Sequence, residues 1–235
     1  MNEMERIKNK EGSIVLTEEK KDMINFMVEA DVLRFGDFVT KSGRNTPYFI
    51  NTGNYKTGMQ LAALGKFYAG MVHAALRDGF SAMFGPAYKG IPLVAVCATA
   101  YWERYRIDKP YFFNRKEEKD HGEGGSIIGY QPVDGDRIIL IEDVITAGTA
   151  VREILPLLKS FGDVQVTDMF ISVDRMEYGQ TPGLSAVAEV AGEFGLRVHA
   201  LVNVDDIREW LAESGRDPEE LRRMDAYREK YCVRS

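Results

Sequence analysis

The chain has 235 residues, of which 45% are hydrophobic and 28% are charged, and these fractions are those of an ordinary globular protein. Its formal net charge of −6 at pH 7 argues against a nucleic-acid partner, although it leaves room for a local basic site. Two cysteines, a polar start of mixed charge and no apolar run of membrane-spanning length exclude a disulfide framework, a secretory signal and a membrane partner, so we expect a cytoplasmic protein.

Residues 1–60 are predicted to form a polar leader and a small N-terminal hood. The leader covers residues 1–16, and Thr17 begins a helix because its side chain suits the cap and Glu18 and Glu19 suit the first turn. Apolar residues then recur at helical spacing as far as Leu33. Short strands with turns are expected between residues 35 and 51, and a second helix over residues 59–77.

From residue 81 onward, strands and helices alternate along the chain. Strands are expected over residues 81–84, 111–113, 126–129, 137–141, 164–173 and 197–202. Helices are expected over residues 91–105, 149–161, 182–194, 204–214 and 217–231. This alternation predicts β-α-β crossovers and a parallel sheet with both faces covered by helices. We therefore expect one α/β core that includes the C-terminal helices, over residues 61–235, preceded by the hood over residues 1–60.

Residues 138–150 combine a buried strand with a polar loop. Four large aliphatic residues lead to Glu142 and Asp143, and Thr146-Ala147-Gly148-Thr149 then precedes an amphipathic helix. Such a loop offers backbone N–H groups, hydroxyls and a helix N-terminus to an anion, while the carboxylates accept hydrogen bonds from hydroxyls. A phosphorylated sugar would satisfy both halves. A P-loop is excluded because the chain has no Gly-x-x-x-x-Gly-Lys-Ser/Thr segment, so the alternative is a pair of acids in a solvated loop.

Two further segments begin at the ends of predicted strands. In residues 84–92 the glycines allow close approach to a ligand and Lys89 supplies a charge for a phosphate, although a plain surface turn is the simpler alternative. Residues 114–125 contain no apolar side chain and carry basic residues beside three glycines. This composition indicates a solvated loop that can close over a polyphosphate. Because ligands gather at the carboxyl ends of parallel strands, these segments are expected to meet residues 142–150.

Together, these segments resemble the motifs of the type I phosphoribosyltransferases, and with the segment from Lys41 to Phe49 they resemble the orotate phosphoribosyltransferase family. The resemblance implies a type I phosphoribosyltransferase-like parallel sheet flanked by helices, with a small N-terminal hood. It also implies an activity in pyrimidine (UMP) biosynthesis. Ribose 5-phosphate would pass from phosphoribosyl diphosphate to orotate, which gives orotidine 5′-phosphate and diphosphate.

The resemblance also assigns roles to individual residues. The residues expected to bind phosphoribosyl diphosphate are Lys41, Tyr88, Lys89, Arg115, Lys116, Lys119, His121, Glu142, Asp143, Val144, Ile145, Thr146, Ala147, Gly148, Thr149 and Ala150. Those expected to bind orotate are Lys41, Phe49, Ile50, Thr146 and Arg175, and those expected to act in catalysis are Lys119, His121 and Asp143. The chain departs from the family at Glu142, where Asp is frequent, and at Ile50, where Phe is frequent. The charge survives the first change, whereas a stacking contact would not survive the second.

The family further implies Mg²⁺ and a second subunit. The metal is expected to bind mainly through the substrate diphosphate, with no metal site made by the protein alone. In the family, residues of the basic loop reach the neighbouring active site, so a homodimer with shared active sites is expected. The remaining partners are the two small substrates, orotate and phosphoribosyl diphosphate.

Two other functions stay open at this point. A phosphoribosyltransferase for another base, such as a purine, would share residues 138–150 but would not need Lys41 and Arg175, which suit a carboxylate. A non-enzymatic sensor of phosphoribosyl diphosphate could share the fold, but it would not need a basic loop that closes over a leaving group.

Overall fold

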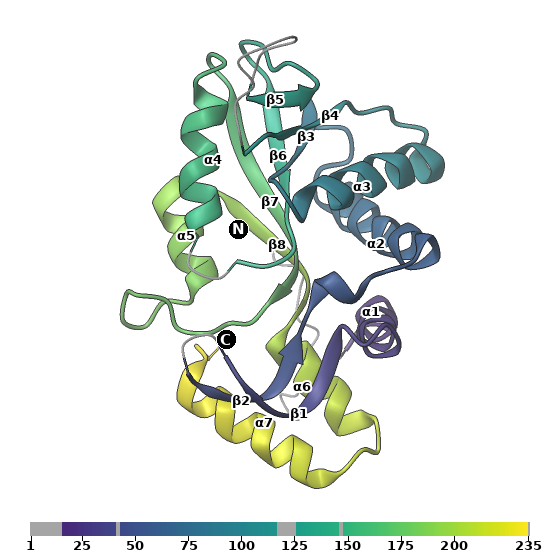
Figure 1. Cartoon of the computed structure of the whole chain (residues 1–235), viewed down its shortest axis with the longest axis vertical. Coiled ribbons are helices and arrows are strands. Elements are labelled where there is room, and N and C mark those ends of the chain that lie inside the picture. Colours follow the sequence, from purple (N-terminus) through teal and green to yellow (C-terminus); the bar gives the residue numbers. More distant parts are fainter. Residues whose placement is uncertain (1–15, 41–42, 117–125, 146–147, 235) are drawn as a thin grey trace. The chain divides into compact units, whose positions relative to one another are not determined.

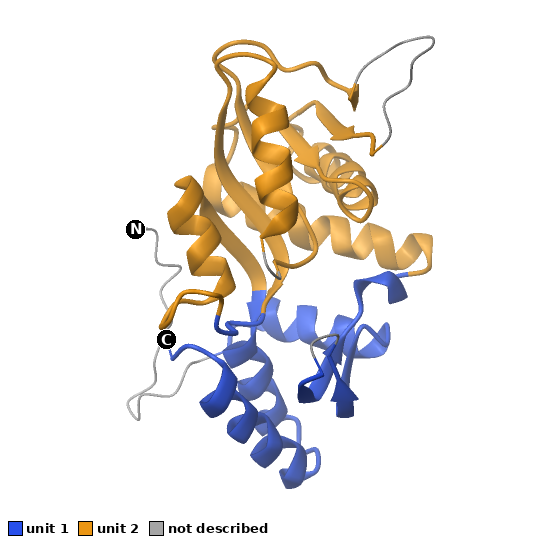
Figure 2. Cartoon of the chain, turned by 60° about the vertical axis from the view of Figure 1, so that its left-hand side comes forward, with its two compact units in different colours: residues 1–55, 175–178, 202–235 blue, residues 56–174, 179–201 orange. Residues whose placement is uncertain are grey.

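The computed structural model describes residues 16–40, 43–116, 126–145 and 148–234. The chain divides into two compact units, shown in Figure 2. Unit 1 comprises residues 1–55, 175–178 and 202–235, and unit 2 comprises residues 56–174 and 179–201. The division into hood and core at residue 60 stays a prediction. No helix in the described ranges is long and apolar enough to cross a membrane.

Unit 2 is built on a six-stranded sheet with the strand order β5-β4-β3-β6-β7-β8. The strands are β3 (Ala82–Gly85), β4 (Tyr111–Asn114), β5 (Ile127–Gly129), β6 (Arg137–Ile141), β7 (Gln165–Asp174) and β8 (Arg197–Asn203). The pairs β3–β4, β3–β6 and β6–β7 are parallel, which confirms the α/β fold and the mostly parallel sheet. At the edge, β5 pairs antiparallel with β4.

Helices cover both faces of this sheet, as Figure 1 shows. The helices α2 (Gly58–Leu76) and α3 (Gly90–Tyr105) pack side by side on one face, and α4 (Thr149–Lys159) and α5 (Ala186–Phe194) lie on the other. The aliphatic residues of β6 are fully buried, and alternate ones, Ile138 and Leu140, share a core with the apolar face of α4. Burial on both faces explains why this strand reads as a continuous apolar run.

The helix expected from residue 182 begins only at Ala186. Ser185 is its N-cap, and the Ser185 side chain accepts a hydrogen bond from the backbone N–H of Ala188. Gly183 has φ of 84°, a left-handed conformation that keeps the preceding residues out of the helix. Pro182 and Gly183 therefore form a turn ahead of the cap.

Unit 1 contains a two-stranded antiparallel sheet and helices from both ends of the chain. Its elements are α1 (Glu18–Glu29), β1 (Leu33–Val39), β2 (Asn45–Ile50), the 3₁₀ helix η1 (Thr52–Asn54), α6 (Val204–Glu213) and α7 (Pro218–Tyr231). Thr17 caps α1 by accepting a hydrogen bond from the N–H of Lys20, as its sequence position predicts. Residues 175–178 leave β7 and pair with the chain end: the N–H of Val233 donates to the carbonyl of Met176 at 2.8 Å.

Candidate functional site

The carboxyl ends of the neighbouring strands β3 and β6 bring two of the predicted loops into contact. Lys89 lies in the loop after β3, and its Nζ is 2.7 Å from Oδ2 of Asp143, which follows β6. The two residues are 54 positions apart in the sequence. Their contact follows from the parallel pairing of β3 with β6, because both strands end at the same edge of the sheet.

Asp143 and Glu142 are buried carboxyl groups that the backbone holds in place. Oδ1 of Asp143 accepts a hydrogen bond from the N–H of Val144 at 2.8 Å, and Oε1 of Glu142 accepts one from the N–H of Asp143 at 2.8 Å. Only 8% of Glu142 and 6% of Asp143 is exposed. Burial raises the pKa of Glu142 to about 8, and the nearby charge of Asp143 adds to the shift. The pair is thus pre-oriented and reluctant to carry two full charges.

The loop after β3 is packed too tightly for side chains at its two ends. A Cβ atom on Gly85 would lie 2.2 Å from the carbonyl oxygen of Gly90, so both glycines are needed for this approach. The peptide bond between Ala87 and Tyr88 is cis. The N–H of Ala87 donates to Oδ1 of Asn114 at 2.8 Å, which joins this loop to the end of β4, where the basic segment begins.

The described part of the basic segment lies beside Tyr88. The Nζ atom of Lys116 is 5.1 Å from the centroid of the Tyr88 ring, a cation–π contact on an exposed side chain. The N–H of Arg115 donates to the carbonyl of Ser126 at 2.8 Å, so the two sides of the segment are paired at its base. The predicted residues Lys119 and His121 lie outside the described residues.

The N-terminus of α4 is the third part of this strand edge. Gly148 is the N-cap of α4 with φ of 70°, and no side chain of this residue can cap the helix, so first-turn N–H groups are left to bind an anion. Thr149 and Ala150 are exposed there, whereas Ile145 is buried and Val144 half-buried, with Val144 bridging to Val173 of β7. Thr146 and Ala147 lie outside the described residues.

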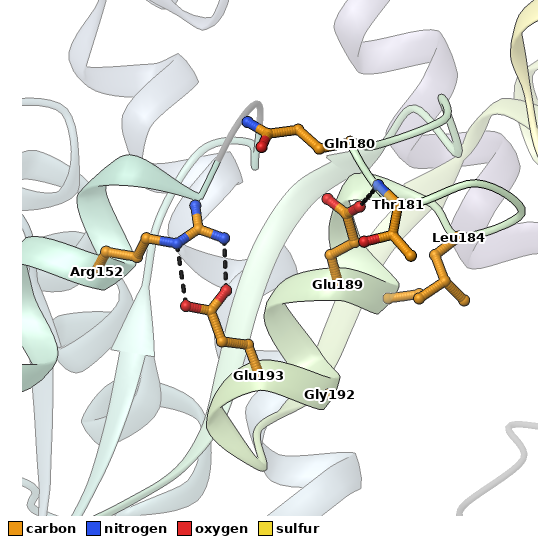
Figure 3. A pocket seen from close by; sticks show the side chains of 8 residues that line it. Arg152, Gln180, Thr181, Leu184, Glu189, Gly192 and Glu193 are labelled. Carbon is orange, nitrogen blue, oxygen red and sulfur yellow. Dashed lines mark hydrogen bonds and ion pairs between the residues drawn. The ribbon is translucent and has the colours of Figure 1, made fainter.

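Behind Gly148, α5 supports this helix start. A Cβ atom on Gly148 would lie 2.5 Å from Cγ2 of Val190 and 3.1 Å from Nη1 of Arg152. Figure 3 shows Arg152 paired with Glu193 of α5, at 3.1 Å from Nε to Oε1 and 2.5 Å from Nη2 to Oε2. The pair forms one wall of a pocket of about 260 Å³. None of the predicted site residues that the structure describes lines this pocket, and Arg152 is paired with a carboxylate, so we place the site at the strand edge.

Three of the residues expected to bind the base, Phe49, Ile50 and Arg175, lie in unit 1. Arg175 directly follows β7, and its Nη2 is 2.5 Å from Oε1 of Glu177 while its Nε donates to the hydroxyl of Tyr48 at 3.4 Å. Phe49 and Ile50 are half-buried at the end of β2, where the ring of Phe49 stacks on another aromatic ring. Lys41 lies outside the described residues.

The sequence patterns did not single out Glu177 or Tyr227. Glu177 is half-buried, and its Oε1 also accepts a hydrogen bond from the hydroxyl of Tyr227 in α7 at 2.7 Å. Neither residue belongs to a recognisable motif. The one available signal was the position of Glu177, two residues after a predicted substrate-binding arginine.

The comparisons with known proteins agree on one family. A family model described as "Phosphoribosyl transferase domain" matches residues 51–179. The orotate phosphoribosyltransferase of Clostridium beijerinckii is 50% identical over 192 residues, which cover 82% of this chain and 85% of the relative. That of Pseudomonas aeruginosa is 45% identical over 214 residues, 91% of this chain and 98% of the relative. A crystal structure of orotate phosphoribosyltransferase from Francisella tularensis is similar with a TM-score of 0.81 and 36% identity, and covers 90% of this chain and 100% of that chain.

Proposed function

The chain belongs to the phosphoribosyl transferase family and, within it, to the orotate phosphoribosyltransferases, and we propose from this premise how its residues divide the work. The enzyme transfers ribose 5-phosphate from phosphoribosyl diphosphate to N1 of orotate, which releases diphosphate and forms orotidine 5′-phosphate. This pentosyl transfer is a step of pyrimidine biosynthesis. The observation that supports the assignment of residues best is the contact of Lys89 with Asp143 at the edge where α4 also begins.

The sugar is proposed to bind at Glu142, Asp143 and residues 144–150. The two carboxyl groups accept hydrogen bonds from the ribose 2′- and 3′-hydroxyls, and a charged acceptor, as Asp143 is in its ion pair with Lys89, makes such a bond strong. The 5′-phosphate lies at the N-terminus of α4, where N–H groups and the helix dipole favour an anion. Thr146 and Ala147 complete this loop in the proposal.

The diphosphate is proposed to bind the cations of two loops. The Lys89 side chain is 59% exposed, so its ammonium group is open to a ligand phosphate beside Asp143. Tyr88, Arg115 and Lys116 line the same edge of unit 2, and Lys119 and His121 are the proposed catalytic cations of the basic loop. These cations would offset the charge that develops on the leaving group, and His121 is the proposed general acid for it.

The base is proposed to bind through Lys41, Phe49, Ile50, Thr146 and Arg175. The guanidinium of Arg175 matches the planar carboxylate of orotate with two parallel hydrogen bonds. Backbone groups at residues 49 and 50 would contact the ring, and this contact does not depend on the identity of residue 50. The anomeric carbon becomes oxocarbenium-like as the bond to diphosphate loosens, so catalysis consists of positioning N1 and stabilising charge, with Asp143 holding the sugar.

Mg²⁺ is the proposed cofactor. Within the described ranges, no group of three or more His, Cys, Asp or Glu residues could hold a metal ion. The two carboxyl groups after β6 fit an ion that keeps water and takes most of its ligands from the substrate, because Mg²⁺ gives up its hydration shell reluctantly. When bound, Mg²⁺ would neutralise charge on the departing diphosphate.

Glu142→Gln tests the buried carboxyl group through its effect on stability. The raised pKa means that Glu142 keeps a proton in the folded protein at pH values where the unfolded chain has released it. Its contribution to the free energy of unfolding is therefore full below pH 4.5 and is lost as the pH rises towards about 8. We expect the melting temperature of the wild type to fall more steeply over this range than that of the variant. Thermal unfolding at a series of pH values measures both curves, and parallel curves would contradict the raised pKa.

Initial rates with different bases test the function itself. With phosphoribosyl diphosphate and Mg²⁺ held constant, we expect rapid release of diphosphate with orotate and far slower release with uracil, adenine and hypoxanthine. The reason is that only orotate carries the carboxylate for which Arg175 is suited. Faster turnover of either purine would favour the alternative base, and ligand binding without diphosphate release would favour a sensor.

The proposed enzyme is a homodimer with shared active sites, and its proposed location is the cytoplasm. The homodimer is supported by the similarity to the family and by the cations Arg115 and Lys116, which directly follow Asn114 at the end of β4. Sedimentation equilibrium at working concentration measures the number of subunits, and a monomer with full activity would rule out shared sites.

A further inference from the structure

We propose that Glu177 is a positioning residue for the base substrate, which fixes the guanidinium of Arg175 in the orientation that receives the carboxylate of orotate. This inference rests on the proposed role of Arg175. It extends that role to a residue in no recognised motif, which lies on a segment of only four residues, 175–178, in unit 1.

Both oxygens of Glu177 are engaged. Oε1 receives Nη2 of Arg175 at 2.5 Å and the hydroxyl of Tyr227 at 2.7 Å, while Oε2 lies 3.3 Å from Nη2 of Arg44. The Glu177 side chain is only 14% exposed. A carboxylate fixed by several donors in a half-buried position has little freedom to rotate, so it holds its arginine partner in one geometry.

Tyr48 fixes the same guanidinium from a second side. Its hydroxyl accepts a hydrogen bond from Nε of Arg175 at 3.4 Å, and its ring centroid lies 5.4 Å from the guanidinium carbon. Burial raises the pKa values of both Tyr48 and Tyr227, the latter to about 12, so both hydroxyls stay protonated at neutral pH. Contacts at Nη2 and Nε orient the guanidinium plane. Among the described residues no partner accepts from Nη1, so its N–H groups and the second N–H of Nη2 are left to donate to the two oxygens of a carboxylate.

The charge of this cluster suits an anionic base. Two guanidinium groups, Arg44 and Arg175, share the single carboxylate of Glu177, so one positive charge remains uncompensated within these three residues. An arginine neutralised by its own carboxylate would compete poorly for orotate. Here the carboxylate is shared, so it orients Arg175 without cancelling the charge that attracts the ligand.

The chain end fixes the backbone of Glu177. Glu177 and Cys232 form an antiparallel bridge, and the N–H of Tyr178 donates to the carbonyl of Tyr231 at 2.9 Å. Tyr227 lies one turn earlier in α7, and its ring meets that of Tyr48 edge-on at 5.7 Å between centroids. The C-terminal helix and the residues after it therefore build the support for Arg175.

The test measures Michaelis constants for both substrates in Glu177→Gln, which keeps the shape of the side chain but removes its charge. We expect KM for orotate to rise about tenfold, as for the loss of one oriented charge-assisted hydrogen bond, with KM for phosphoribosyl diphosphate unchanged. Glu209→Gln is the matched control, because Glu209 is 20% exposed and pairs with one arginine, Arg208, at 3.0 Å. The control is expected to leave both constants unchanged.

A double-mutant cycle with Arg175→Ala shows whether Glu177 acts through Arg175. We expect Glu177→Gln to add nothing to the orotate KM of Arg175→Ala, because the group that it positions is gone. Full additivity, or an equal rise in both Michaelis constants, would overturn the proposal. If Glu177→Gln does not fold, Tyr227→Phe removes one donor without a change in charge and is expected to raise only the orotate KM; no rise would be equally decisive against it.

The failure of this inference is distinguishable from that of the proposed function. If Arg175→Ala raises the orotate KM while Glu177→Gln does not, only the positioning role is wrong. If Arg175→Ala leaves the orotate KM unchanged in an enzyme that still uses orotate, the base-binding assignment of Arg175 is wrong, and the positioning role falls with it.

Discussion

Asp143→Asn is expected to lower kcat/KM for phosphoribosyl diphosphate by about 100-fold, because hydrogen bonds to a charged acceptor contribute roughly 1.5–3 kcal/mol each. The variant removes the charge that receives a ribose hydroxyl and the charge that holds Lys89 at 2.7 Å. The N–H of Val144 donates to Oδ1 of Asp143. If the new amide nitrogen took the position of Oδ1, two donors would face each other there. Initial rates at varied phosphoribosyl diphosphate, with orotate saturating, measure the loss.

Asp136→Asn is the matched control for this variant. Asp136 precedes β6 at its opposite end, is 8% exposed, and accepts hydrogen bonds from the hydroxyl of Tyr130 and the N–H of Val133, each at 2.9 Å. We expect this control to lower the melting temperature and to leave the Michaelis constants unchanged. If both variants lose activity equally, the effect of Asp143 is one of folding, and its role at the sugar must be abandoned.

Much of the strand edge could be predicted from local sequence. The uninterrupted aliphatic residues of β6 indicate a strand buried on both faces, and the acids that follow must then emerge at its carboxyl end. Parallel pairing brings the loop after β3 to the same place, although Lys89 and Asp143 are 54 residues apart. The antiparallel edge strand β5 was not predictable, because a three-residue strand carries no signal of its direction.

The surroundings of Arg175 could not be predicted, because they depend on pairing between distant segments. Glu177 acquires its partners from β2, which supplies Tyr48, and from α7, which supplies Tyr227. No spacing in the sequence records that residues 175–178 leave the strand to pair with the chain end. From sequence alone, a polar residue after a strand is predicted to be solvated, because only the tertiary structure shows which hydrogen-bond donors contact it.

Arg175→Ala is expected to raise KM for orotate by about 100-fold and to leave KM for phosphoribosyl diphosphate unchanged, because a two-pronged contact with a carboxylate is lost. It should also reduce the preference for orotate over uracil, since uracil lacks the carboxylate and gains nothing from this arginine. The ratio of kcat/KM for the two bases measures this preference and is insensitive to a general loss of active protein.

Arg208→Ala separates this effect from the loss of an ion pair in unit 1. Like Arg175, Arg208 is 26% exposed at its side chain and paired, with Nε at 2.9 Å from Oδ1 of Asp225. Its removal is expected to change stability without changing the preference between the bases. Arg175→Lys refines the result, because lysine keeps the charge but not the planar fork, and we expect it to recover only part of the preference. If Arg175→Ala discriminates between orotate and uracil as strongly as the wild type, another group reads the carboxylate.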